Sequence, residues 1–275
     1  MEKLGVDLVH VHFGFERFAI DELEQWIRVV ERHGIHMVHT VHDIDNPHLV
    51  DQRSHHERTR LLVERADDVI TLTSAAATAI FTRWNRKVSV IAHPPLGRHQ
   101  TIAAARTRRP LMWLGTMRPN IDREIVESIV RTPDASIDVA IRSEGWEVAD
   151  EVLRRALSAA ASAGRIALSI IERPSDTELD SRIAAAGVLI LPYRWGTHSG
   201  LVELAACLGV PTATTPTGCR EDQGAVVATG SDLLACARLA AHSPRFVRRG
   251  PSAAEVRTAH RRFYSSIVAG TTAPT

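Results

Sequence analysis

Segments with the pattern of a buried strand alternate with segments of helical spacing along almost the whole chain. The first strand-like segment is Val6 to Val11, and Phe18 to Glu31 follows it with apolar residues three or four positions apart. Apolar residues at that spacing fall on one face of a helix. Short apolar runs that alternate with such helices predict parallel sheets covered by helices. The sequence therefore predicts an α/β fold, in which ligands bind at the carboxyl ends of the strands.

The rest of the chain continues this alternation. The expected strands are 37–41, 68–72, 88–92, 111–115, 137–141, 167–171, 188–191 and 211–214. The expected helices are 52–66, 75–84, 121–130, 147–161, 176–186, 199–208 and a last one that begins near 252. Ser74 is expected to cap one of these helices, and Ser175 and Ser252, each followed by glutamate three residues later, predict capping boxes.

One stretch, from Gly97 to Pro110, has no periodicity and contains five basic or histidine residues. We interpret it as a connection between two domains, which a chain of 275 residues can accommodate. The predicted boundaries are 1–97 for the first domain, 98–110 for the linker, 111–250 for the second domain and 251–275 for a crossover helix and tail.

The composition excludes several classes of partner. A formal net charge of +1 gives no broad attraction to nucleic acid or to an anionic membrane. The three cysteines lie at no metal-binding spacing, which is typical of a reducing compartment. The sequence contains no signal peptide and no run that approaches the roughly 18 apolar residues of a membrane span. We therefore expect a cytoplasmic protein without a transmembrane span and without nucleic acid as a partner.

The most informative loop lies between the apolar run 188–191 and the helix that begins near Ser199. A helix start presents free backbone N–H groups and the positive end of the helix dipole, which suits a phosphate. Gly200 allows the backbone to approach a ligand closely. Glu203, in the first turn, is placed to accept hydrogen bonds from sugar hydroxyls. A phosphate beside a polyol describes a nucleotide sugar.

Several segments, taken together in their order, resemble the GT-B fold retaining glycosyltransferases, in particular glycosyltransferase family 4. They are 9–14, 40–43, 66–74, 115–120, 197–203 and Gly209. The resemblance implies two Rossmann-like domains, with the donor bound mainly by the C-terminal domain, the acceptor bound by the N-terminal domain, and a last helix that crosses back toward the N-terminal domain. It also implies that a hexose is transferred with retention from a UDP- or GDP-linked donor to an unknown acceptor, without a metal ion or other cofactor.

The resemblance assigns roles to individual residues. Arg118 is implied to stabilise the departing diphosphate, Glu203 to hold the ribose, and His42 to reach the transferred sugar. Arg123 stands near the place of a lysine that family members usually carry. The other residues implied to bind the donor are Gly115, Asn120, Thr197, His198, Ser199, Gly200 and Leu201. The acceptor side of the cleft is expected to include His12, Gly14 and Asp43.

The chain departs from the family at its N-terminus. Several strand–helix units precede the segment that resembles Val6 to Gly14 in the family, whereas only five residues precede it here. The N-terminal sheet is therefore expected to be incomplete, with uncovered strand edges. Three explanations stay open at this point: a start upstream of Met1, a partner chain that supplies the missing strands, or a degenerate protein.

Two other functions remain as alternatives. The incomplete sheet also fits a non-catalytic or partner-dependent subunit that binds a sugar nucleotide. The fourteen histidines raise a metal-dependent hydrolase, because His10 and His12 alternate on a strand and so point to one face. Against the hydrolase, the second half of the chain lacks a matching set of His and Asp residues at its strand ends.

Overall fold

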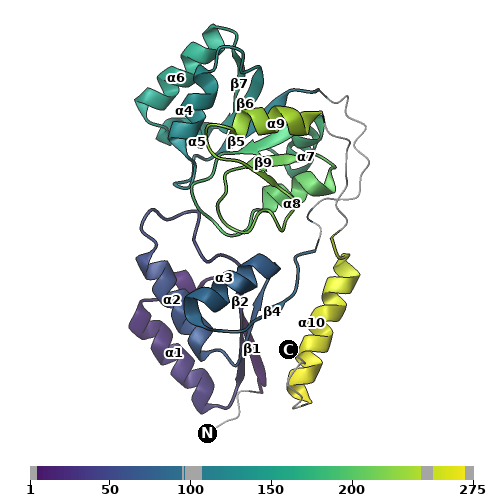
Figure 1. Ribbon diagram of the computed structural model, residues 1–275. Helices are drawn as coiled ribbons and strands as arrows, with labels where there is room; N and C mark the ends of the chain where they lie inside the picture. Colours follow the sequence, from purple (N-terminus) through teal and green to yellow (C-terminus); the bar gives the residue numbers. More distant parts are fainter. Residues whose placement is uncertain (1–4, 95, 97–106, 243–249, 270–275) are drawn as a thin grey trace. The chain divides into compact units, whose positions relative to one another are not determined.

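The computed structural model describes residues 5–94, 96, 107–242 and 250–269 (Figure 1). These residues form two compact units. The first comprises residues 5–46, 51–94 and 250–269, and the second comprises 47–50, 96 and 107–242. The predicted linker 98–110 lies outside the described residues up to position 106, and Pro110 already belongs to a strand.

The first unit contains a sheet of four parallel strands in the order β1-β2-β3-β4. The strands are β1 (Leu8–Val11), β2 (His36–Val41), β3 (Asp68–Thr71) and β4 (Ser89–Val90). The helices between them are η1 (Phe15–Arg17), α1 (Ile20–Arg32), α2 (Arg53–Arg65) and α3 (Ser74–Trp84). Within the described residues, no strand pairs with the outer edge of β1.

The two faces of this sheet carry different cores, because successive residues of a strand point to opposite sides. Met37 and Val41 of β2 pack against the apolar side of α1 and α2. Val38, between them, joins a second cluster with Val256 and Phe263 of the last helix, α10 (Ala253–Val268). The expectation that the C-terminal helix crosses back to the N-terminal domain is therefore confirmed.

The second unit contains six parallel strands in the order β10-β9-β8-β5-β6-β7. The strands are β5 (Pro110–Gly115), β6 (Ile137–Arg142), β7 (Ile166–Ile171), β8 (Val188–Leu191), β9 (Thr212–Thr214) and β10 (Val226–Val227). The helices are α4 (Arg123–Arg131), α5 (Ser143–Val148), α6 (Glu151–Ser162), α7 (Asp176–Ala185), α8 (Gly200–Cys207) and α9 (Leu233–Ala241).

The strand order of the second unit reverses direction between β5 and β8. From β5 the chain builds outward through β6 and β7, and from β8 it builds the other way through β9 and β10. A reversal of this kind leaves a crevice at the carboxyl ends of the two central strands, and ligands of open α/β sheets bind there. The loops after β5 and β8 are therefore the first places to look for a site.

Three helices start or are capped differently from the prediction. The expected helix 147–161 is two helices, because the Asp150 carboxylate accepts a hydrogen bond from the Leu153 N–H at 2.8 Å and so starts α6 afresh. Thr73, rather than Ser74, caps α3 through its hydroxyl oxygen. The helix expected from Ser199 begins at Gly200, with Ser199 as its N-cap.

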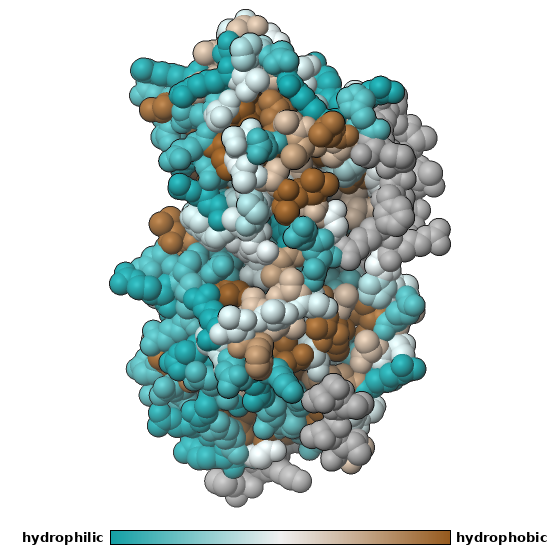
Figure 2. All heavy atoms as spheres, in the orientation of Figure 1, coloured by the Kyte–Doolittle hydropathy of each residue, from teal (hydrophilic) through white to brown (hydrophobic). Residues whose placement is uncertain are grey.

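Polar side chains cover much of the face shown in Figure 2, and apolar residues appear among them in small groups. Scattered exposed apolar residues are normal on a folded protein. No helix of the described residues is both long and apolar enough to span a membrane.

Candidate functional site

The loops after β5 and β8 are tied together by main-chain and side-chain hydrogen bonds. The Asn120 amide nitrogen donates to the Trp195 carbonyl at 3.1 Å, and the Arg194 N–H donates to the Asn120 carbonyl at 2.7 Å. The Asp122 N–H donates to the Pro192 carbonyl at 2.7 Å. Asn120 is 3% exposed, so the amide implied to bind the donor also holds the two loops side by side.

A buried arginine, Arg220, stabilises the β8–α8 loop through hydrogen bonds. It is 1% exposed, and its guanidinium donates to the Thr217 carbonyl, to the Thr217 hydroxyl at 2.6 Å and to the Trp195 carbonyl at 3.0 Å. It also lies over the Tyr193 ring, 4.9 Å from the centroid. Because the Trp195 and Thr217 carbonyls accept hydrogen bonds from Arg220, the guanidinium fixes the conformation of the loop that leads into α8.

Gly218 allows a close approach that the loop needs. Its φ is +70°, and a Cβ added there would lie 1.9 Å from the Gly196 carbonyl oxygen. The Cys219 N–H donates to the Thr197 carbonyl at 2.8 Å in the same contact. The turn after β9 is thus packed directly against the loop that leads into α8.

The start of α8 is partly closed and partly open. The Gln223 side-chain oxygen accepts from the Ser199 N–H at 2.9 Å, and the Gln223 amide donates to Glu203 Oε1 at 2.8 Å. Within the described residues, the N–H groups of Gly200 and Leu201 donate no hydrogen bond. Gly200 is exposed, so these two donors are the part of the helix start that a ligand can reach.

Tyr193 completes the support below the helix start. Its side chain hydrogen bonds to the side chain of Ser199, and burial raises the pKa of Tyr193, so the phenol stays neutral. The positive charges of Arg220 and Arg118 oppose that rise in the pKa. Arg118 is therefore near enough to Tyr193 for its charge to act there, and its own side chain is exposed.

The other residues implied to bind the donor have varied surroundings. Gly115 ends β5 with a φ of +53°. Arg123 forms an ion pair with the Asp150 carboxylate at 2.6 Å, which holds its guanidinium at the start of α6. Thr197 is buried in the loop before α8, and His198 is half-buried beside it.

In the first unit, the side chains implied to line the acceptor side follow β1 and β2. His12 Nδ1 lies 3.0 Å from His42 Nε2, so one of these imidazoles donates a hydrogen bond to the other. Gly14 has a φ of +92° and is the N-cap residue of η1. The structure therefore brings His12 and His42 together at the carboxyl ends of neighbouring strands.

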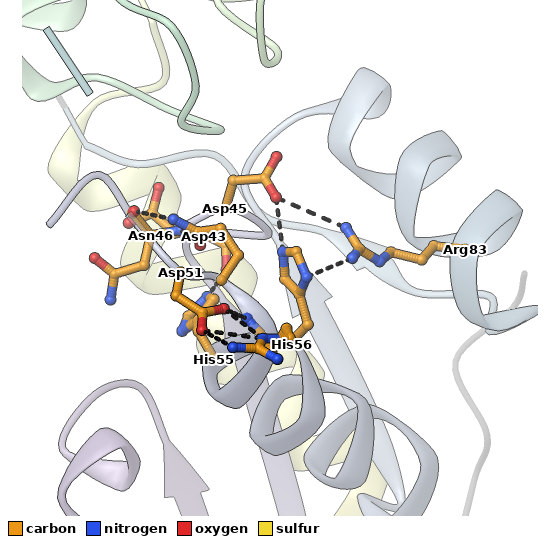
Figure 3. Close-up of polar contacts among 9 residues, drawn as sticks. Asp43, Asp45, Asn46, Asp51, His55, His56 and Arg83 are labelled. Atoms are coloured by element: carbon orange, nitrogen blue, oxygen red, sulfur yellow. Dashed lines mark hydrogen bonds and ion pairs between the residues drawn. The ribbon is translucent and has the colours of Figure 1, made fainter. Parts of the chain in front are cut away.

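Asp43 lies in a loop that two histidines of α2 hold in place (Figure 3). The His55 imidazole donates to the Asp43 carbonyl at 3.0 Å. His56 contacts the Asp45 carboxylate at 2.8 Å and Arg83 at 2.7 Å. These contacts fix the segment that directly follows His42.

The histidines of the described residues do not assemble a metal site. No group of three or more His, Cys, Asp or Glu side chains in this part of the chain has a geometry that could hold a metal ion. Both ring nitrogens of His10 are engaged, with Tyr264 Oη at 2.6 Å and Thr40 Oγ1 at 2.7 Å. Burial lowers the pKa of His10 to about 4. The described residues therefore contain no set of metal ligands that would support the hydrolase interpretation.

Sequence reasoning missed the residues that hold the α8 start in place. Arg220 follows a strand end, and that position is a weak signal for a functional role. Gln223 belongs to no motif, and only the folded chain brings it to Ser199 and Glu203.

Comparison with solved structures gives the fold. HepE from Anabaena in complex with UDP-glucose matches with a TM-score of 0.60 and 13% identity, over 96% of this chain and 79% of HepE. Sucrose-phosphate synthase from Thermosynechococcus elongatus matches with a TM-score of 0.59 and 13% identity, over 97% and 75% of the two chains. A protein described as UDP-N-acetylglucosamine 2-epimerase from Listeria monocytogenes matches with a TM-score of 0.56 and 12% identity, over 98% and 75%.

No protein-family model matches the sequence, and no curated protein matches it significantly. At 10 to 14% identity the structural matches establish architecture rather than activity. The observed sheets, the reversal between β5 and β8 and the returning C-terminal helix agree with them. The chain therefore has the GT-B type of fold, with two Rossmann-like units.

Proposed function

We propose that this protein is a glycosyltransferase that binds a nucleotide sugar at the carboxyl ends of β5 and β8 and transfers its hexose to an acceptor. The observation that carries the proposal is the start of α8, where the Gly200 and Leu201 N–H groups are open and Glu203 stands one turn further on. The N–H groups suit the diphosphate, and the Glu203 carboxylate suits the ribose hydroxyls.

The chemistry follows from the charges at this site. The leaving nucleoside diphosphate gains negative charge in the transition state, and Arg118 together with the α8 start would stabilise that charge. We propose that this stabilisation needs no metal ion and that transfer proceeds with retention. His42 would contact the hexose as it is transferred, and positioning of the two substrates would supply the rest of the rate enhancement.

Two further features support this reading. One match is named a sucrose-phosphate synthase, and HepE was solved with UDP-glucose, with UDP and with UDP and glucose. The three cysteines are free thiols, which fits our proposal that the protein works in the reducing cytoplasm.

Calorimetric titration with UDP and with GDP tests the donor site. Arg118→Ala and Glu203→Ala are each expected to weaken binding by about 1–3 kcal/mol, because each removes a charged partner of a ligand group. Arg131→Ala is the matched control, since its exposed guanidinium pairs only with Glu127 in the same helix among the described residues. Equal affinity in all four proteins would contradict the proposed site.

A partner-dependent or non-catalytic role is the second candidate, and it is favoured by the outer edge of β1, which no strand of the described residues covers. Incubation of the purified chain with UDP-glucose and simple glycosides separates the two. Formation of a new glycosidic bond supports the transferase, whereas tight nucleotide binding without turnover supports the second candidate. Conversion of the donor sugar without transfer would point instead to an epimerase.

A further inference from the structure

Four aromatic rings lie in a row at the carboxyl ends of β1 and β2; the outermost pair is stacked, and the other two pairs are tilted by 42° and 34°. Phe13 lies over His42 with a centroid distance of 4.2 Å and an angle of 25° between the ring planes. The His42 and His12 centroids are 5.3 Å apart, and those of His12 and His10 are 4.0 Å apart. We call Phe13, His42, His12 and His10 the ring stack.

The ring stack is anchored at its inner end and open at its outer end. His10 hydrogen bonds to Tyr264 of α10 and to Thr40 of β2, and the His12–His42 hydrogen bond links the next two rings. Phe13 has only His42 as a stacking partner among the described residues, and it is 65% exposed. The Phe13 ring is thus exposed to solvent while its stacking on His42 fixes its position.

The exposure of Phe13 contrasts with that of Phe15, two residues further on. Phe15 is 6% exposed and belongs to the core beneath α1 and α2. Between the two, Gly14 adopts a φ of +92°, and its N–H donates to the Glu16 carboxylate at 2.9 Å. This turn sends Phe15 inward and leaves Phe13 outside, so local geometry fixes the exposed position.

His12 precedes Phe13 in the sequence and shares His42 with it as a partner, and it offers a polar atom. His12 uses Nδ1 in its contact with His42, and within the described residues Nε2 makes no hydrogen bond. Partial burial of the ring lowers the pKa of His12, and the nearby His260 lowers it further, so the imidazole is neutral near pH 7. In a neutral imidazole Nε2 either donates or accepts, depending on the tautomer.

We propose that the ring stack binds a pyranose ring of the acceptor, so that the acceptor is a saccharide or a glycoside. One face of a pyranose carries C–H groups with partial positive charge, which the negative face of Phe13 attracts. The sugar also needs hydrogen-bond partners for its hydroxyls, and His12 Nε2 offers one. The inference rests on the proposed function, since it names the substrate class of the acceptor side.

Saturation-transfer NMR tests the inference with the methyl glycosides of glucose, galactose, mannose and N-acetylglucosamine as probes, and with uridine as the competing stacking ligand. We expect saturation of the aromatic protons to reach the ring C–H groups of at least one glycoside. Phe13→Ala is expected to weaken that binding about tenfold or more, while Phe13→Trp retains it. Phe81→Ala is the matched control, because Phe81 is also exposed but lies on α3, and it is expected to change nothing.

Several results would overturn the inference. They are no transfer to any of the four glycosides, equal transfer in wild type and Phe13→Ala, or transfer to uridine alone. Sedimentation that shows a wild-type dimer dispersed by Phe13→Ala would also overturn it, because the ring would then serve association. The melting temperature of each variant checks that it is folded, as expected for changes at exposed rings.

A separate UDP titration distinguishes this inference from the proposed function. If UDP binds and no glycoside does, the ring-stack inference fails and the donor site stands. If a glycoside binds through Phe13 and UDP does not bind, the proposed function fails, and the ring stack is a saccharide-binding site but not an acceptor site. With an active enzyme, Phe13→Ala should raise the KM for the glycoside acceptor more than the KM for the donor.

Discussion

The carboxyl-end loops of the two units offer a ligand different kinds of groups. At the start of α8, the side chains of Arg220, Gln223 and Asn120 are buried and bind the backbone, so that backbone N–H groups face outward. At the ends of β1 and β2, the side chains of Phe13 and His12 are themselves exposed. The start of α8 therefore offers a ligand backbone N–H groups, and the ends of β1 and β2 offer it side chains.

This difference indicates what each site is suited to recognise. Backbone N–H groups are the same whatever the side chains are, so they fit a diphosphate that does not vary with the sugar. Rings and imidazoles depend on a few side chains, and they fit a ligand whose identity changes from one protein to another. Substitutions should therefore act at the second unit through the supporting residues and at the first unit through the contacting ones.

Lowering the pH is expected to give the largest loss of stability, and to destabilise the first unit more than the second. Four histidines of the first unit, His10, His12, His39 and His55, have a lowered pKa, chiefly because of burial. Burial lowers the pKa of His39 to about 4. The unfolded chain binds protons more readily at these sites, so their contribution to stability is full above about pH 6.5 and is lost as the pH falls toward 4.

For His39 alone this loss is about 3 kcal/mol. Hydrogen exchange followed peptide by peptide should show the first unit opening before the second as the pH is lowered. His39→Asn keeps a donor for the Val11 carbonyl but cannot titrate, and it should flatten the pH dependence. Simultaneous opening of both units would contradict the assignment.

Loss of Arg220 is expected to give the next largest effect. Arg220→Ala leaves the Thr217 and Trp195 carbonyls without their buried partner and creates a cavity, so the free energy of unfolding should fall by about 3 kcal/mol. UDP binding should be lost with it. Arg194→Ala, in the same loop but exposed, should change stability by less than about 0.5 kcal/mol. Similar denaturant midpoints for the two variants would show that the loop does not depend on its buried support.

A smaller effect is expected at a glycine pair with matched backbones. Gly218 and Gly164 both have a φ of +70°, but a Cβ at Gly164 meets nothing within 4 Å, whereas one at Gly218 meets the Gly196 carbonyl oxygen. Gly164→Ala should therefore cost only the backbone strain, about 1 kcal/mol. Gly218→Ala should cost about 2 kcal/mol in all and should weaken UDP binding, because it displaces the loop before α8. Thermal unfolding of the pair separates strain from crowding.

The sequence predicted the alternation of strands and helices well, because periodic apolar residues report which face of an element is buried. It missed α9, whose sequence Leu233–Ala241 is apolar except for Arg238 and so carries little helical periodicity. It also missed the break before α6, where Asp150 caps a new helix inside an otherwise continuous pattern.

The sequence predicted the part of the candidate site that depends on local spacing, and it missed the part that depends on long-range packing. Gly200 and Glu203 are neighbours on one helix, so their shared position follows from local spacing. Gln223 and Arg220 reach the same loop from 20 or more residues away, and only the packing of β9 beside β8 brings them there. The exposure of Phe13 depends on the turn at Gly14, which composition alone does not specify.

The central claim, that the open N–H groups of α8 bind a diphosphate, is tested most directly by replacing the first helical residue. Proline is tolerated at that position and removes one N–H, and the extended conformation of Ser199 suits a following proline. Gly200→Ala is the control, because it adds a Cβ near the flexible end of Leu96 but keeps the N–H. In UDP calorimetry we expect Gly200→Pro to bind at least about tenfold more weakly than Gly200→Ala. Equal affinity for the two variants would contradict the account.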